Sequence, residues 1–517
     1  MRSRRVSSLV FNSTKLEFER ASEKYDVVPV HAVLDSPGFS PIEAMRALRT
    51  HGDPAFIFES ESPEEGASRY AYVCTSIERV VRTGASEAIG DTNPITVLRS
   101  QLQSRTVAPV ADLPDLITGA FGFMAYEAIK HFEPTVGELP IDPTGSPVSA
   151  FAVPHELLVF DRVIDQLHII VFANETASFE MTTERIHEIC KNLESISVAL
   201  EPAIAPHVGS LPSELGNSVK PTSDKFPEMV RKAREAIIEG ELIQVVLGQR
   251  VETKTSADPL DIYEQLSTLN PSPYMYMLDL GDMQLIGASP ELLLRSSSGK
   301  ASVHPIAGTR PRGVTAEDDL QNEADLLSNE KESAEHVMLV DLARNDLGRV
   351  SKPGTVKVKS LKHVERYSHV MHLVSRVEGQ LVDDKDGIDA FESGFPIGTL
   401  SGAPKIRSIQ LIAELEPEGR GPYCGGIGWF GSNGDVDTGT IIRSIVLRDG
   451  VAHVQGGAGI VFDSNPEAEN LESLQKAKAP LLAIERAESM EQQQRWRNDD
   501  SVSLDTTHPA TMQLISE

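Results

Sequence analysis

A run of apolar positions between residues 226 and 237 repeats with the period of an α-helix. Its apolar side chains fall on one stripe: Phe226, Met229, Val230, Ala233 and Ile237. Ser223 or Asp224 can cap the first turn, and Gly240 follows the last one. The pattern predicts an amphipathic helix that opens the second half of the chain.

The stretch from Trp429 to Phe462 has the apolar runs of β-strands, interrupted by two hairpin dipeptides. These dipeptides, Asn433-Gly434 and Asp449-Gly450, favour tight turns between antiparallel strands. We expect a meander with strands near residues 425–430, 438–447 and 451–456.

A last helix is predicted after Gly459. Asn465 can cap it, and Pro466 stands in the first turn, where proline is tolerated. Its expected apolar face consists of Leu471, Leu474, Leu481 and Leu482. From about Met490 the chain turns polar, which predicts a disordered tail.

The chain divides into two blocks by composition. Residues 25–195 mix short strands and helices, with two strands expected between Glu156 and Ala173 around Ile164-Asp165. The stretch from Pro202 to Pro221 has few large apolar residues and reads as a linker. We therefore predict an N-terminal domain over 25–195, a catalytic domain over 223–487 and a tail over 488–517. Hairpins and helices that do not strictly alternate favour an α+β fold.

Composition restricts the function. The net charge of −28 argues against nucleic acid as a partner, because no basic footprint is present. No apolar run reaches 18 residues and no secretory signal opens the chain, so we expect neither a membrane span nor export. Three scattered cysteines suit a reducing cytoplasm. An anionic substrate would need cationic groups gathered locally.

Two Glu-x-x-Glu pairs are candidate metal ligands. Glu332 and Glu335 form one pair, and Glu469 and Glu472 form the other on the predicted last helix. Residues three apart share a helix face, so each pair can direct two hard oxygen donors at one Mg²⁺ ion. Such pairs are also common on solvated helix faces, and spacing alone does not choose between the two interpretations.

Other residues carry weaker signals. Gly-rich stretches at 308–309, 398–405 and 456–459 match neither a phosphate-binding loop nor a dinucleotide fingerprint, so ATP and NAD are not indicated. His372 lies in an apolar run, where a structural role competes with acid–base catalysis. Arg443 lies in an apolar strand pattern and needs an anionic partner, either a structural carboxylate or a ligand. No Gly-x-Cys-x-Gly glutaminase element is present.

Several longer segments, taken in order, resemble the chorismate-utilising enzymes. They are Pro305–Gly313, Glu335–Asp346, Met371–Ser375, Gly398–Lys405, Tyr423–Gly426 and Gly457–Gly459. The resemblance spans about residues 223–480, with a fainter part over 25–175. It implies an α+β fold of layered antiparallel β-sheets with helices around a central cleft.

The resemblance also implies roles for individual residues. Glu335 and Glu472 resemble the principal Mg²⁺ ligands, with Glu332 and Glu469 in support, and the ion would hold the ring carboxylate of chorismate. Arg443 and Tyr423 match the grip on the pyruvyl carboxylate, and His372 matches the acid–base residue. The remaining matches line the substrate pocket or face the site: Gly308, Thr309, Thr399, Gly457, Ala458, Gly459 and Lys476.

Two positions separate branches of the family. Gln244 stands where water-adding members carry lysine, which favours ammonia as the nucleophile. Ala307 stands where aminodeoxychorismate synthases often carry a nucleophilic lysine. The resemblance therefore implies an anthranilate synthase large subunit, a carbon–oxygen lyase of tryptophan biosynthesis. The alternatives are an aminodeoxychorismate or aminodeoxyisochorismate synthase and, in another class, a catalytically silent sensor of tryptophan or chorismate.

The same branch implies two partners. A separate glutamine amidotransferase subunit would supply ammonia, and L-tryptophan would act as a feedback inhibitor at a remote site. The matching inhibitor residues are Glu59, Ser60, Pro273, Tyr274 and Met275. The chain departs from the branch pattern at Ile57-Phe58, Cys424, Trp429 and Gly439.

Overall fold

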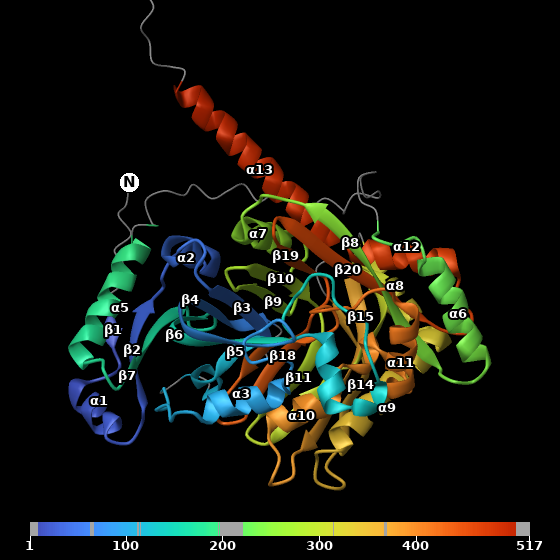
Figure 1. The fold of residues 1–517 in the computed structure, drawn as a ribbon, viewed down its shortest axis with the longest axis horizontal. Coiled ribbons are helices and arrows are strands. Elements are labelled where there is room, and N and C mark those ends of the chain that lie inside the picture. Colours follow the sequence, from blue (N-terminus) through green and yellow to red (C-terminus); the bar gives the residue numbers. More distant parts are fainter. Residues whose placement is uncertain are drawn as a thin grey trace, which may run out of the picture.

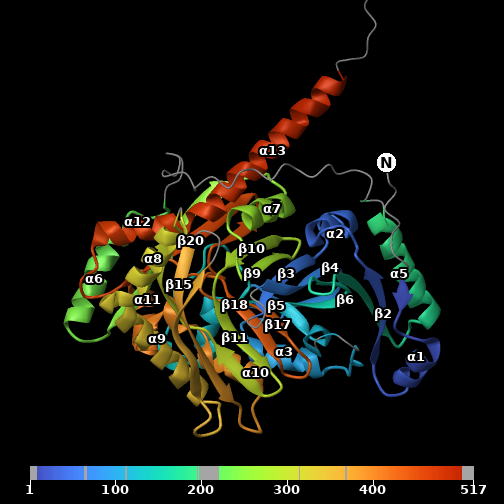
Figure 2. The same ribbon diagram turned by 180° about the vertical axis from the view of Figure 1, so that it is seen from behind.

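Antiparallel strands form the centre of the molecule and most helices lie around them (Figure 1 and, from behind, Figure 2). The computed structural model describes residues 9–62, 67–110, 113, 115–194, 196, 221–313, 315–366 and 370–502. The predicted linker lies almost wholly outside the described residues. The strands divide into two arms that start from β4 (Ala67–Thr83) and β6 (Ser149–Asp161), which pair with each other.

The first arm leads from β4 to the strands that carry one half of the candidate site. Each neighbouring pair is antiparallel, in the order β3 (Ala55–Ser62), β9 (Tyr274–Asp279), β10 (Met283–Ser289), β19 (Ser444–Arg448), β20 (Val451–Ile460), β8 (Gln244–Lys254) and β16 (Gly402–Ala403).

The second arm leads from β6 to the strands of the other half. Its order is β5 (Ala120–Met124), β17 (Gly426–Phe430), β18 (Val436–Thr440), β11 (Leu292–Ser297), β12 (Lys300–Val303) and β15 (Val370–Gln380), which also pairs with β13 (Ile306–Pro311) and β14 (Lys357–Arg366). Further along β6, residues Glu156–Asp161 pair with β7 (Gln166–Asn174), which is followed by β2 (Val27–Asp35) and β1 (Val10–Phe11).

An aromatic core fills the space between the arms. Its largest members come from strands of both arms and are fully buried: Phe56, Phe58, Phe121, Tyr276 and Trp429. Burying one such side chain contributes on the order of 1.5–3 kcal/mol. Two further cores lie against helices. One includes α2 (Pro41–Leu48), α5 (Phe179–Glu194), α7 (Pro259–Leu269) and α13 (Lys478–Val502), and the other α3 (Pro94–Gln103), α9 (Glu330–Gly348), α10 (Gly387–Gly394) and α11 (Lys405–Leu415).

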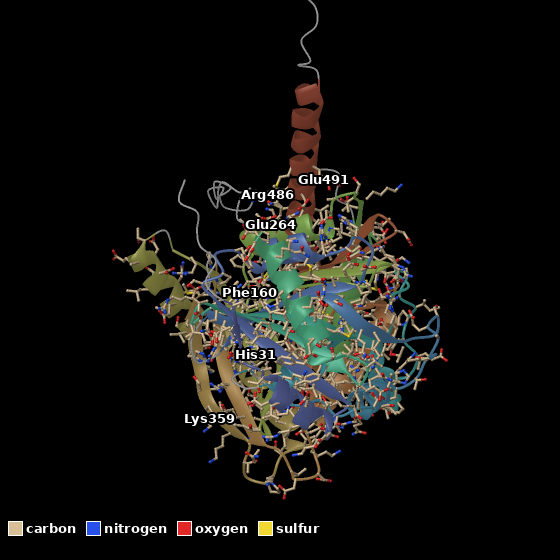
Figure 3. All side chains as sticks on the ribbon, turned by 90° about the vertical axis from the view of Figure 1, so that its left-hand side faces the viewer. His31, Phe160, Glu264, Lys359, Arg486 and Glu491 are labelled. Carbon is tan, nitrogen blue, oxygen red and sulfur yellow. The ribbon has the colours of Figure 1, made fainter. Side chains whose placement is uncertain are left out.

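The remaining helices are shorter or cover the ends of the arms. They are α1 (Lys15–Ser22), α4 (Ile129–Phe132), α6 (Phe226–Ile238), α8 (Ala316–Ser328) and α12 (Pro466–Lys476). The first half of α13 lies on α7, and in its middle Glu491 Oε1 accepts from the Asp258 N–H at 3.0 Å. Figure 3 shows Glu264, Arg486 and Glu491 in this region. The far end of α13 projects away from the body (Figure 1).

The predicted α+β class with layered antiparallel sheets is confirmed. Strands of the two predicted blocks nevertheless pair directly, β3 with β9 and β5 with β17. The division at residues 25–195 and 223–487 stays a prediction, and the blocks share one hydrogen-bonded sheet network.

The predicted helix at 226–237 is confirmed as α6, and its five stripe residues are buried. Its cap differs from the prediction, because Lys225 occupies the cap position without a side-chain hydrogen bond and Ser223 Oγ accepts from the Lys225 N–H. The strand pair between Glu156 and Ala173 is confirmed as β6 and β7, with Asp165 in the left-handed region at φ 53° in the turn.

The two predicted hairpins are confirmed as β17 with β18 and β19 with β20, but their union in one meander was wrong. The predicted second strand, 438–447, is divided at Arg443, whose φ is +49°, between β18 of the second arm and β19 of the first arm. The break arises because Ile441 pairs with a loop instead of a strand. Its N–H donates to Gly425 O and its carbonyl accepts from the Cys424 N–H, both at 2.9 Å. Arg443 is therefore not a residue of a continuous strand.

The last predicted helix is confirmed as α12, with Asn465 capping the N–H groups of Glu467 and Ala468. Leu471 is 57% exposed, so its place in the apolar face was wrong, and Leu481 and Leu482 belong to the next helix, α13, where Leu481 is buried. Helix α13 continues to Val502, so the first part of the predicted tail is helical, and residues 503–517 lie outside the described ones. Among the described helices, none is long and apolar enough to cross a membrane.

Candidate active site

The ends of the two arms meet where β8 faces α9. Gln244, the first residue of β8, donates from Nε2 to Glu335 Oε1 of α9 at 2.7 Å. A Cβ on Gly459 of β20 would lie 2.7 Å from the same Nε2, so any larger residue there would displace the Gln244 side chain. We call this region the junction, and most of the residues predicted for the site surround it.

Carboxylates gather at the junction. Burial raises the pKa of Glu335 against the hydrogen bond from Gln244, and the charges of Glu332 and Glu472 raise it further. Burial also raises the pKa of Glu469, with the charge of Glu472 adding to the rise. The negative charge of Glu472 on α12 therefore repels that of Glu335 on α9, so the two predicted pairs interact although they lie on different helices.

Two of the four carboxylates have cationic partners. Glu472 Oε1 lies 2.9 Å from Lys476 Nζ, which also donates to Gly457 O at 2.9 Å. Glu332 Oε1 accepts from Arg310 Nη1 at 3.1 Å. Within the described part of the chain, no three His, Cys, Asp or Glu side chains converge closely enough to hold a metal ion. The donor chemistry still fits Mg²⁺, because the group is all carboxylate and the repulsion within it would be relieved by a divalent cation.

His372 lies in β15 beside the junction and is 5% exposed. Its Nδ1 lies 3.1 Å from both Gly308 O and Thr309 Oγ1. Because a carbonyl oxygen only accepts, the proton belongs on Nδ1, and Nε2 is the ring's acceptor in the neutral form. Burial lowers the pKa of His372, opposed by the Gly308 carbonyl, and the charge of Arg443 lowers it further. The ring is therefore neutral near pH 7.

A buried carboxyl group that sequence reasoning missed lies close by. Glu291 is 4% exposed and accepts from Thr399 Oγ1 at 2.5 Å. Burial raises the pKa of Glu291 to about 7, while Thr399, Arg443 and Lys476 oppose the rise. Burial also lowers the pKa of Arg443, and the charge of Glu291 counters this. The sequence did hold a signal for it, because a glutamate between two apolar strand segments is expected to be buried and to need a partner.

Tyr423 and the glycines of β20 form another wall. Tyr423 is 6% exposed, and a Cβ on Gly457 would lie 2.8 Å from its hydroxyl. Its ring also abuts Gly248, where a Cβ would lie 3.0 Å from Cε1. A cavity of about 30 Å³ opens beside Gly248 and Arg250 and is lined by none of the predicted site residues. The close packing fixes the tyrosine ring against β8 and β20.

The predicted inhibitor residues lie elsewhere, along the pairing of β3 with β9. Glu59 stands opposite Met275 and Ser60 opposite Tyr274, with Pro273 adjacent in sequence. We call this region the seam. Glu59 accepts from Tyr263 OH at 2.6 Å and pairs with Arg162. Tyr274 OH donates to Asp437 Oδ1 at 2.9 Å and accepts from Arg295 Nη2 at 3.0 Å.

The departures at Trp429 and Gly439 belong to the seam. Trp429 packs edge-on against Phe56 and Tyr72, with ring centroids 5.6 and 5.5 Å apart. A Cβ on Gly439 would lie 2.6 Å from Tyr274 Cγ, so the tyrosine occupies the space that a side chain would need. The structure thus brings the predicted residues together in two groups, one at the junction and one at the seam.

Fold and junction define an α+β enzyme whose site combines clustered carboxylates with a buried histidine, arginine and glutamate. The family profile described as chorismate binding enzyme matches residues 53–482, and the chain belongs to this family. The resemblance stated from the sequence is thereby confirmed.

Known proteins agree with this assignment. Anthranilate synthase component 1 of Streptomyces coelicolor is 43% identical over 476 residues, which cover 90% of this chain and 91% of that protein. The crystal structure of anthranilate synthase component I from Streptococcus pneumoniae has a TM-score of 0.69 and 35% identity, covering 81% of this chain and 93% of that one. The menaquinone-specific isochorismate synthase of Escherichia coli, 19% identical with a TM-score of 0.65 over 89% of this chain and 94% of that one, shares the fold.

Proposed function

We propose that this chain is the chorismate-using subunit of an anthranilate synthase. It would add ammonia to C2 of chorismate, release the C4 hydroxyl as water, and eliminate pyruvate to give anthranilate. The observation that carries the proposal is the hydrogen bond from Gln244 to Glu335, within a chain 43% identical to an anthranilate synthase component 1. A neutral amide therefore lies beside the candidate metal ligands, where water-adding members of the family carry a lysine.

The orientation of Gln244 supports ammonia as the nucleophile. Because Nε2 donates to Glu335, the amide oxygen Oε1 is the group that can receive a further donor. Oε1 is buried and has no hydrogen-bond partner among the described residues. Ammonia carries N–H groups that can satisfy this acceptor, and a buried unsatisfied acceptor costs about 1–3 kcal/mol. Gln244 would therefore hold ammonia near C2.

Substrate binding would divide between two groups of residues. Mg²⁺ held by Glu335 and Glu472, with Glu332 and Glu469 in support, would supply positive charge to the ring carboxylate. Arg443 and Tyr423 would bind the pyruvyl carboxylate, because a buried guanidinium gains most from an anionic partner. Lys476, Gly308, Thr309 and backbone N–H groups of Gly457, Ala458 and Gly459 would complete the pocket.

Proton transfer would use two groups with opposite pKa shifts. Glu291 titrates at about 7, so a large fraction is protonated near neutral pH and can donate to the departing C4 hydroxyl. His372 is neutral there, so Nε2 can accept the C2 proton when the bond to pyruvate breaks. Glu291 would thus serve as the acid and His372 as the base. Thr399, bound to Glu291, would hold that carboxyl in place.

The proposal includes two partners and a compartment. The absence of a glutaminase element in the sequence supports a separate amidotransferase subunit that delivers ammonia from glutamine, and the name component 1 of the relatives fits such a partner. L-tryptophan would bind at the seam, where Glu59 would exchange its present partners for the ligand's amino group. The cysteine content supports a cytoplasmic location.

Product analysis tests the proposal. The purified chain is incubated with chorismate, Mg²⁺ and ammonium, and anthranilate and pyruvate are followed together. We expect equal amounts of both, abolished by EDTA, and no product when water is the only nucleophile. Consumption of chorismate without pyruvate would instead indicate an aminodeoxychorismate or aminodeoxyisochorismate synthase. No consumption at all would favour a silent sensor.

A further inference from the structure

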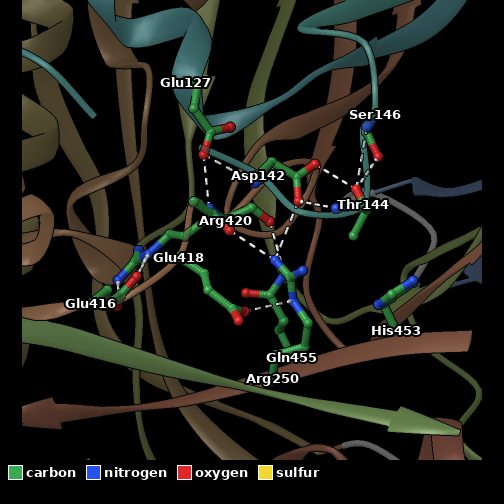
Figure 4. A network of polar contacts seen from close by, with 12 residues as sticks. Glu127, Asp142, Thr144, Ser146, Arg250, Glu416, Glu418, Arg420, His453 and Gln455 are labelled. Carbon is green, nitrogen blue, oxygen red and sulfur yellow. Dashed lines mark hydrogen bonds and ion pairs between the residues drawn. The ribbon is translucent and has the colours of Figure 1, made fainter. Parts of the chain in front are cut away.

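The loop that carries Tyr423 is held by residues of the first block. Residues 419–421 precede Pro422 and Tyr423, and Figure 4 shows the polar network around them. Glu127, from the turn after β5, accepts the N–H groups of Arg420 at 2.8 Å and Gly421 at 3.0 Å, both on Oε1. The neighbouring Tyr126 N–H donates to Gly421 O at 2.8 Å.

A second segment of the first block closes the other side of the loop. The Gly419 N–H donates to Ile141 O at 2.9 Å. A Cβ on Gly419 would lie 2.5 Å from Pro140 O, so the two backbones are in direct contact. These hydrogen bonds and contacts hold the loop against both segments of the first block.

Arg420 connects this loop to the candidate site residues. It is 1% exposed, and its guanidinium binds Glu416 by two hydrogen bonds of 2.9 and 2.6 Å. It also donates to Leu400 O at 3.0 Å, directly after Thr399, and lies over the Tyr423 ring at 5.8 Å. The same residue thus contacts the loops of two candidate site residues.

We propose that Glu127 is a positioning residue for substrate binding, which sets Tyr423 and Thr399 at the junction through the backbone and side chain of Arg420. This inference rests on the proposed function. Burial, with the charge of Asp142 adding to it, raises the pKa of Glu127 to about 7. Removing it leaves two backbone donors unsatisfied beside the residues that grip the substrate.

The test compares Glu127→Ala with Glu127→Gln, whose amide oxygen can still accept both N–H groups. For Glu127→Ala we expect kcat/KM for chorismate to fall roughly 10- to 100-fold, mostly through KM, because small misplacements near a site have effects of this size. Glu127→Gln is expected to restore the wild-type KM. Hydrogen exchange of the Arg420 and Gly421 amides is expected to accelerate in Glu127→Ala only.

A matched control separates positioning from stability. Glu156 is a buried carboxylate of the first block, 3% exposed and bound twice by Arg185, outside the loop network. Glu156→Ala is expected to lower the melting temperature without changing KM. If Glu127→Ala does not fold, Glu127→Asp, which shortens the reach by one methylene, takes its place.

The experiment distinguishes failure of the Glu127 inference from failure of the proposed function. An active wild type with an unchanged KM in the Glu127 variants, or a Glu127→Gln variant as impaired as Glu127→Ala, would overturn the inference alone. A wild type that does not turn over chorismate would overturn the proposed function, and the amide exchange rates would still decide whether Glu127 holds the loop.

Discussion

At the junction, burial raises the pKa values of Glu291, Glu335 and Glu469, whereas at the seam the charged side chains are joined in ion pairs. Among the described residues, the Glu291 carboxyl group accepts one hydrogen bond, from Thr399 Oγ1, and burial raises its pKa to about 7. At the seam, Asp437 is bound twice by Arg295 and once by Tyr274. Burial lowers the pKa of Arg295, but the charges and hydrogen bonds of Asp437 and Tyr274 together raise it. The carboxyl groups of the junction thus hold protons more tightly than free glutamate does, whereas the charges of the seam are already neutralised by one another.

Replacing His372 at the junction is expected to have the largest effect. His372→Ala removes the proposed proton acceptor, and kcat is expected to fall roughly 10²- to 10⁴-fold, the range for acid–base residues. The measurement is steady-state anthranilate formation with ammonium. His453→Ala, in β20 but bound to Glu252, is the control and is expected to keep wild-type turnover. A His372→Ala variant of normal activity would remove the histidine from the mechanism.

Replacing Glu291 tests the role of its raised pKa through the pH dependence of kcat. Its pKa lies above its ordinary value of 4.5, at about 7, so the proton donor is lost as pH rises through 7. Wild-type kcat is expected to decline on that alkaline side, and Glu291→Gln to reduce kcat about 100-fold while abolishing the decline.

The same shift has a consequence for stability. The folded state binds this proton more tightly than the unfolded state, so the stabilisation present below pH 4.5 disappears as pH rises through about 7. Glu291→Gln is therefore expected to gain stability relative to wild type above pH 7, measured by denaturant unfolding. An unchanged pH profile of both kcat and stability would contradict the role of this carboxyl group.

A smaller effect, on stability alone, is expected at the seam. Tyr274→Phe removes the hydroxyl between Asp437 and Arg295 and is expected to lower the free energy of unfolding by about 1–3 kcal/mol. Turnover with ammonium is expected to stay at the wild-type value. A loss of turnover without a loss of stability would show that the seam and the junction are coupled more closely than their separate contacts indicate.

Local patterns predicted local structure well. The α6 stripe, the Asn465 cap and the hairpin dipeptides each depend on residues within a few positions of one another. The break at Arg443 escaped prediction, because its cause is a loop some 17 residues away that takes the hydrogen bonds of Ile441.

Candidate site residues were also predicted best where they lie close together in sequence. The two glutamate pairs were visible from their spacing on helices, and the roles of the other candidate residues came from the family resemblance. Glu291 was missed because its hydrogen-bonding partner at the candidate site is distant in sequence. Its significance comes from Thr399, 108 residues later, and from the burial of Glu291 itself. Charges that become unusual only through folding leave little trace in a linear pattern.

The pairing of β5 with β17 has a consequence for biosynthesis. Met124 of β5 pairs with Gly426, about 300 residues later in the chain. At roughly 5–20 residues per second, the ribosome delivers that partner some 15–60 s after β5 emerges. During this interval one edge of β5 awaits its partner, and apolar strand edges of this kind favour association between chains. Successful production of this enzyme therefore depends on what shields the nascent N-terminal half until the last strands arrive.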